Sequence, residues 1–157
     1  MDESISRLAL HEAGHAVAHF VLGRPVVRVV ARQDEHQTEP VPGTALAPRR
    51  EAVLFYAGFE AELFSMGSPS QDSSDYLTAW MNGGHHDDES KVSMLAKRYP
   101  EVHPEEARAE AAELIARYWP LIEDVARCLE RKELLDQVRI IEIATLRGVE
   151  YGEAATT

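Results

Sequence analysis

The chain has 157 residues, of which 45% are hydrophobic and 27% are charged, and these values are typical of a soluble globular protein with one domain. Its net charge of −11 argues against nucleic acid or an anionic membrane as a partner, because both attract basic protein surfaces. Cys128 is the only cysteine, the acidic N-terminus does not resemble a signal peptide, and no apolar run reaches the ~18 residues of a membrane span, so we expect a cytoplasmic protein.

The first third of the sequence predicts one helix and one strand. Apolar residues recur at three- and four-residue spacing over residues 5–22, which predicts a helix that ends at Gly23 and Pro25. Residues 26–32 (VVRVVAR) are β-branched and alternating, so they favour a strand. Residues 33–48 contain three prolines and a glycine, and we expect a loop or an irregular hairpin around the segment TALA.

The rest of the sequence is predicted to be almost entirely helical. A helix is expected over residues 50–65, and the polar loop 67–75 supplies N-cap residues for a helix that starts near Asp75 and is broken at residues 83–90. Four further stretches have helical periodicity: residues 88–99, 104–119, 120–132 and 137–148. We therefore expect a mainly α (α+β) protein with a small sheet early in the chain and a C-terminal helical bundle. Residues 1–152 would form one domain and residues 153–157 a disordered tail.

Residues 11–15, His-Glu-Ala-Gly-His, form an HExxH motif within the first predicted helix. Positions i and i+4 share one helix face about 5–6 Å apart, so His11 and His15 can bind one Zn²⁺ ion. Glu12 would lie beside the ion and act as the catalytic general base that takes a proton from a zinc-activated water. Gly14 costs the helix about 1 kcal/mol relative to alanine, which suggests close backbone packing beside the site. The helix is thus predicted to be zincin-like.

A catalytic zinc site needs a third protein ligand, and the spacing of the residues leaves several candidates open. His19 continues the row of histidines, but it lies two helical turns, roughly 11–12 Å, from His11 and cannot share one ion with it. The remaining candidates are acidic or histidine side chains of later segments: Glu60 and Glu62 on the second predicted helix, Asp75 at the start of the next, and the cluster of His85, His86, Asp87 and Asp88.

Four segments carry a resemblance to a known family: HEAGHAVA, LFYAGFEAELFSMG, SQDSSDYLTAW and ARYWPLIEDVARCLERKELLDQVRIIEI. In this order they resemble the peptidase domain of the FtsH-type ATP-dependent zinc metallopeptidase family, over roughly residues 7–146. In the second segment, Gly58, Ala61 and Glu62 match the family's Gly-Arg-Ala-Ala-Glu-Glu motif, whereas Phe59 and Glu60 replace its Arg and Ala. In the third, Asp75 lies in Ser-Asp-Tyr, where the family has Asn-Asp-Leu.

The resemblance implies a ligand set of His11, His15 and Asp75 with Glu12 as the base, and it implies that Glu62 supports a ligand from behind the site. The sequence also departs from the family, because it contains neither a Gly-x-x-x-x-Gly-Lys-[Ser/Thr] phosphate loop nor a membrane span. We therefore expect a stand-alone peptidase domain without intrinsic ATPase activity, to which a separate ATPase or adaptor would have to present folded substrates.

These features together predict a zinc metalloendopeptidase that hydrolyses peptide bonds in peptides or flexible protein segments. Residues 33–48 are unlike the glycine-rich segment that the family has before its second helix, so the sequence does not predict how a substrate is aligned. The alternative is a non-catalytic zinc-binding or protein-interaction module derived from a peptidase, and a helical bundle without metal is a third interpretation. Neither the cleavage preference nor the oligomeric state follows from the sequence.

Overall fold

The structure, a computed structural model, describes residues 4–82 and 85–156. Within these residues the helices and strands follow one another in this order: α1 (Arg7–Leu22), β1 (Val26–Ala31), β2 (His36–Pro40), α2 (Pro48–Ser65), α3 (Ser74–Asn82), α4 (His85–Arg98), α5 (Pro104–Arg117), α6 (Trp119–Lys132), β3 (Leu134–Asp136) and α7 (Gln137–Leu146). The predicted mainly helical architecture with a small sheet is confirmed. None of the helices in the described segments combines the length and the apolar character that crossing a bilayer requires.

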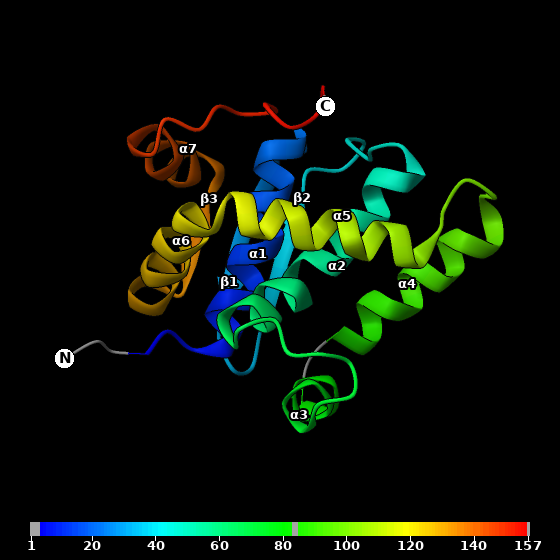
Figure 1. Ribbon diagram of the computed structural model, residues 1–157. Coiled ribbons are helices and arrows are strands. Elements are labelled where there is room, and N and C mark those ends of the chain that lie inside the picture. The colour runs from blue at the N-terminus through cyan, green and yellow to red at the C-terminus, as the bar shows by residue number, and fades with distance from the viewer. Residues whose placement is uncertain (1–3, 83–84, 157) are drawn as a thin grey trace.

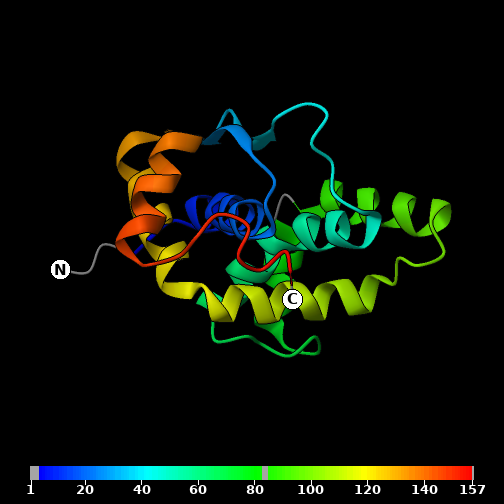
Figure 2. The same ribbon diagram turned by 90° about the horizontal axis from the view of Figure 1, so that it is seen from above.

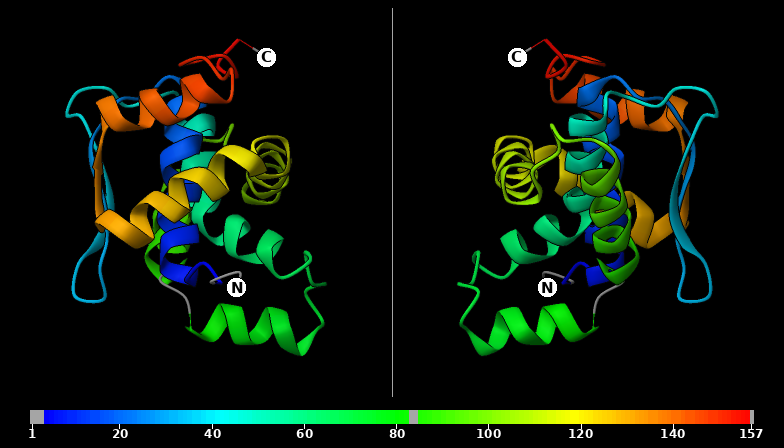
Figure 3. Two further views of the ribbon diagram at one scale, coloured as in Figure 1. Left: turned by 90° about the vertical axis from the view of Figure 1, so that its left-hand side faces the viewer. Right: turned by 90° about the vertical axis from the view of Figure 1, so that its right-hand side faces the viewer.

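Helix α1 lies in the middle of the molecule (Figure 1). Seen from above (Figure 2) and from the side (Figure 3), the sheet lies on one side of α1 and helix α5 on the other. Helix α2 packs against both α1 and α5, and α6 covers a further side of α1. As a result α1 is buried from Ala9 to Leu22, although it carries three histidines and a glutamate. Such polar side chains are buried in proteins only where they have partners.

The sheet has the strand order β2–β1–β3, and both outer strands are antiparallel to β1. Strand β1 agrees with the strand predicted at residues 26–32. Strand β2 lies within the segment predicted to be a loop or irregular hairpin, because His-Gln-Thr-Glu-Pro has no apolar alternation and stays partly exposed at the sheet edge. Strand β3 comes from late in the chain, so the sheet is not confined to the early residues, and its three residues are too few to show a period.

Helices α1 and α2 approach each other closely at Gly14. A Cβ atom at this position would lie 2.7 Å from the carbonyl oxygen of Ala57 and 2.7 Å from the Cβ atom of Ala61. Both neighbours belong to the body of α2, so neither can move away without moving the helix. The glycine in the middle of α1 therefore has the close-packing role that the sequence suggests, and it brings the side chains of α1 within reach of α2.

The C-terminal segment packs on the end of α1. Gly152 and Ala154 donate backbone hydrogen bonds of 2.9 Å to the carbonyl oxygens of Phe20 and Val21, and Ala154 is buried. These bonds satisfy carbonyl groups that the last turn of a helix leaves without partners. The segment thus differs from the disordered tail expected for residues 153–157, of which the last residue lies outside the described part.

Replacing Gly14 by alanine should lower the stability of the protein. The new methyl group gains about 1 kcal/mol of helix propensity, but forcing it against the backbone of α2 costs about 1–3 kcal/mol or more. We expect a net loss of about 1–2 kcal/mol in the free energy of unfolding, measured by urea denaturation. The double variant Gly14→Ala with Ala61→Gly removes one of the two contacts, so its loss should be smaller than the sum of the losses of the two single variants. A Gly14→Ala protein as stable as the wild type would contradict the close packing.

Candidate metal centre

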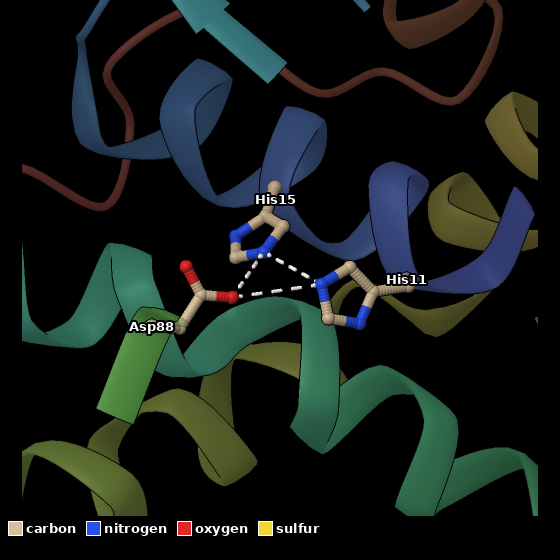
Figure 4. Close-up of side chains that lie close together, drawn as sticks. All are labelled: His11, His15 and Asp88. Atoms are coloured by element: carbon tan, nitrogen blue, oxygen red, sulfur yellow. Dashed lines mark hydrogen bonds and ion pairs between the residues drawn. The ribbon is translucent and has the colours of Figure 1, made fainter. Parts of the chain in front are cut away.

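His11 and His15 lie one helical turn apart on the face of α1 that points toward α2 and the start of α4 (Figure 4). They are 5% and 8% exposed, and their rings meet edge to face with centroids 4.7 Å apart. Their Nε2 atoms are 3.1 Å apart. Asp88, in the first turn of α4, completes the group. Its Oδ2 atom lies 3.2 Å from Nε2 of His15 and 3.6 Å from Nε2 of His11.

The three donor atoms have the spacing that one small metal ion requires. Ligands in a tetrahedral site with zinc–nitrogen bonds of about 2.0–2.1 Å are about 3.3–3.4 Å apart. The distances between the donor atoms run from 3.1 to 3.6 Å, on both sides of that value. Among the described residues, no other set of three histidine, cysteine or acidic side chains converges in this way. The structure therefore contains a buried His–His–Asp group that could hold a metal ion.

Hydrogen bonds fix the orientation of both imidazole rings. His11 donates from Nδ1 to Oε1 of Glu62 at 2.6 Å. His15 donates from Nδ1 to the carbonyl oxygen of Leu54 at 2.8 Å. A neutral imidazole with its proton on Nδ1 presents a lone pair at Nε2. Two lone pairs and a carboxylate oxygen then face one another, an arrangement that is repulsive unless a cation lies between them.

The charges around the group favour a positive charge at its centre. Burial opposes protonation of His11, but hydrogen bonds to Asp88 and Glu62 outweigh it and raise the pKa of His11 to about 10. Burial also opposes ionisation of Asp88, yet hydrogen bonds from His11 and His15 hold the pKa of this carboxyl well below its usual range. A proton and a metal ion therefore compete for the same position, because each neutralises the same carboxylates.

Glu62 links His11 to the surface of the molecule. One of its carboxylate oxygens accepts the hydrogen bond from His11, and the other accepts two from Arg7, at 2.5 Å from Nη2 and 3.1 Å from Nε. Burial would raise the pKa of Glu62, but these partners lower it. A hydrogen-bonded carboxylate behind a histidine ligand fixes the tautomer of that ligand and makes it a stronger donor to a metal. Glu62 therefore contacts the ring nitrogen of His11 that does not face the other donor atoms.

Gly58 of α2 leaves the space in which the two imidazoles meet. A Cβ atom at this position would lie 2.5 Å from Nε2 of His15 and 2.7 Å from Nε2 of His11. The ring nitrogens cannot move aside without breaking the hydrogen bonds on Nδ1. Even the smallest side chain would therefore fill the space beside the donor atoms.

Glu12 and the three donor residues line one cavity of about 450 Å³. The Thr38 hydroxyl of β2 donates a hydrogen bond of 3.0 Å to Oε2 of Glu12. His36, also on β2, has its Nδ1 atom 3.5 Å from Oε1 of the same carboxylate. The edge strand of the sheet therefore holds Glu12 at one side of the cavity that contains the candidate metal position.

The other candidate ligands proposed from the sequence lie elsewhere. Asp75 is exposed at the start of α3 and does not belong to the converging group. Glu60 pairs with Arg108 at 3.4 Å. His19 uses its Nδ1 atom to donate to the backbone carbonyl of His15 at 2.7 Å. The geometry thus brings together a different third carboxylate from the one that the family resemblance implies.

The acidic cluster at the start of α4 contributes one residue to the group, Asp88. Asp87 is exposed, and the ring of His86 lies edge to face against Trp80 with centroids 5.6 Å apart. The side chain of His85 lies outside the part of the chain whose side chains the structure describes. The bond from His15 to the carbonyl group of Leu54 could not be predicted from the sequence, because every residue has a backbone carbonyl group.

The fold and the site define a mainly helical protein with a buried group of two histidines and an aspartate that could bind a metal ion. No protein-family model and no curated protein matches the chain.

Gly58→Ala should abolish metal binding. The added methyl group would overlap the Nε2 atoms of both histidines, so they could no longer converge on one ion. We expect elemental analysis to find about one metal ion per wild-type chain and almost none in the variant after equilibration with zinc. Gly43→Ala controls for general destabilisation and should keep its metal, because the φ of 77° at Gly43 strains any side chain, whereas a Cβ atom there would have no neighbour within 4 Å. Full metal content in Gly58→Ala would count against the site.

Asp88→Asn and Asp75→Asn separate the two assignments of the third ligand. Asparagine keeps the size of aspartate but removes the charge, and a lost ligand should weaken zinc affinity by about 100-fold or more. We expect this loss for Asp88→Asn only, measured by competition with a chromophoric chelator. The opposite result would favour Asp75 and would mean that α3 and α4 are arranged differently around the metal.

Proposed function

We propose that the protein is a zinc-dependent metallopeptidase in which His11, His15 and Asp88 bind Zn²⁺ and Glu12 is the general base. One observation carries this proposal: two imidazole nitrogens and a carboxylate oxygen converge at a buried point, and the glutamate of the same HExxH motif lines the same cavity. The resemblance of four sequence segments to FtsH-type peptidase domains supports the same class of enzyme, although it implies Asp75 as the third ligand.

The set of donor atoms favours zinc over other common divalent ions. Zinc accepts nitrogen and oxygen ligands in tetrahedral geometry, whereas magnesium and calcium prefer oxygen ligands in larger numbers. Three protein ligands leave a fourth position free, which is typical of catalytic rather than structural zinc sites. When bound, zinc would polarise the scissile carbonyl group and lower the pKa of a water molecule.

In the proposed mechanism, Glu12 takes a proton from the attacking water and returns it to the leaving amine. The Thr38 hydroxyl donates to Oε2 of Glu12, which orients the carboxylate, and Oε1, which has Nδ1 of His36 at 3.5 Å, would take the proton. Glu62 and the carbonyl group of Leu54 keep the two imidazoles in the tautomer that presents a lone pair at Nε2. Each of these roles follows from a contact of the residue itself.

The border of the cavity suits a peptide substrate. Residues of β2, including Gln37, Thr38 and Glu39, line it, and β2 is an edge strand of the sheet. An edge strand has unpaired backbone N–H and C=O groups that can bind an extended peptide as an additional strand. This supports peptides or flexible protein segments as substrates, since only an extended chain can make such bonds.

Glu12→Gln should keep the zinc and lose peptide hydrolysis. Glutamine cannot accept the proton of water, and general-base catalysis contributes about 10²–10⁴-fold to a rate. We expect kcat/KM to fall by at least about 10²-fold on fluorogenic peptides, with unchanged zinc content by elemental analysis. Glu142→Gln, an exposed glutamate of α7, is the matched control and should retain full activity.

Two results would contradict the proposal. Undiminished hydrolysis in Glu12→Gln would exclude Glu12 as the base. Zinc binding by the wild type without turnover of a broad peptide library would favour the alternative, a non-catalytic zinc-binding or protein-interaction module.

A further inference from the structure

The cavity beside the candidate metal position is also lined by two cationic side chains. Arg24 follows the C-terminal end of α1, and Lys91 comes from α4. The Nζ atom of Lys91 lies 5.3 Å from the ring centre of Phe55, a residue of α2 that lines the same cavity. The candidate metal group and these two cations therefore line the same cavity.

The guanidinium group of Arg24 is fixed at Nη1 by an ion pair and has further N–H donors. Its side chain is 13% exposed, and Nη1 donates to Oε2 of Glu51 at 2.6 Å. The other oxygen of Glu51 accepts the backbone N–H of Leu46 at 2.7 Å, which fixes the carboxylate. The buried Nε atom of Arg24 has no partner. Burying an unpaired donor costs free energy, and arginine has five N–H groups, so an additional anionic acceptor would stabilise this side chain.

Five carboxylates and two cations line the cavity. Of these carboxylates, Glu12 accepts a hydrogen bond from Thr38. Glu51 is engaged by Arg24, Asp88 belongs to the candidate metal group, and Glu39 pairs with Arg28 at 2.9 Å. Asp87 is exposed at the cavity wall. Within the described residues, Lys91 has no carboxylate partner. This end of the cavity can therefore accept a further negative group.

Arg24 and the candidate metal group both contact helix α2. Leu54 provides the carbonyl that binds His15, and Glu51 lies three residues earlier on the same helix. Three residues of α-helix rise about 4.5 Å. The two contacts thus lie about one helical turn apart along α2, so the cationic end and the candidate metal group are neighbours in the cavity.

We propose that Arg24, assisted by Lys91, binds a carboxylate of the substrate, so that the enzyme prefers peptides with a carboxylate near the scissile bond. This inference rests on the proposed metallopeptidase function and specifies its substrate class. The carboxylate is either an acidic side chain or the C-terminal group of a short peptide, because both offer the same pair of oxygens to a guanidinium.

Binding of hydroxamate probes tests the inference without requiring turnover. Two dipeptide hydroxamates that differ only in an aspartate or an asparagine side chain represent the first source, and a second pair with a free or an amidated C-terminus represents the other. Titration calorimetry on the zinc-loaded wild type gives the four dissociation constants. We expect the carboxylate member of at least one pair to bind about tenfold more tightly than its amide, as for a charge-assisted hydrogen bond.

Arg24→Gln should reduce this preference to less than about twofold, and Lys91→Gln should reduce it by about threefold. Arg147→Gln, which removes an arginine paired with Asp124 far from the cavity, is the matched control and should keep the full preference. Thermal melts followed by circular dichroism report whether each variant folds. If Arg24→Gln does not fold, the exposed Lys91→Gln variant decides the question.

Each outcome supports or overturns the inference. Equal affinity of the wild type for all carboxylate and amide probes overturns it and leaves the proposed function intact. A full preference in Arg24→Gln, or in Lys91→Gln where Arg24→Gln is unfolded, also overturns it. Failure of every hydroxamate to bind the zinc-loaded protein overturns the proposed function as well.

Discussion

The close approach of α1 and α2 is the constraint on which the candidate metal centre depends. Gly14 allows the two helix backbones to meet, and Gly58 leaves the space in which the imidazoles converge. At this separation the side chain of Glu62 and the carbonyl group of Leu54 reach the Nδ1 atoms of the two histidines. The packing of the two helices therefore orients the Nε2 lone pairs of both histidines. Any change that separates the helices would break the hydrogen bonds that fix this orientation.

The sequence predicts the part of the site that is local in the chain. His11 and His15 are four residues apart, and helix geometry alone places them on one face. Asp88 could be named only as one member of an acidic cluster, because its selection depends on how α4 is placed against α2. Acidic residues are common in the first turn of a helix, because they interact favourably with the positive end of the helix dipole. An aspartate at this position therefore does not by itself indicate a metal ligand. The exposed Asp75 shows how a motif match and a tertiary arrangement can differ.

The fold shows the same division between local pattern and tertiary context. The long helices follow from apolar periodicity, and their predicted ranges agree with the structure within a few residues. Strand β2 is polar because it forms the sheet edge, and β3 is short, so neither has a period that a sequence pattern could reveal. The C-terminal residues lack apolar bulk, yet Ala154 is fixed by backbone hydrogen bonds to α1, which involve no side-chain signal. The conformations of β2, β3 and the C-terminal residues thus depend on hydrogen-bond partners that are distant in the sequence.

An ion held between α1 and α4 would also act as a cross-link. His15 and Asp88 are 73 residues apart, so a metal that joins them closes a long loop of the unfolded chain. In the chain-entropy model, a covalent link across such a loop is worth about 4 kcal/mol. This chain has one cysteine and cannot form a disulfide within itself. The metal would provide a comparable restraint, with the difference that a chelator or a fall in pH could remove it and restore it again.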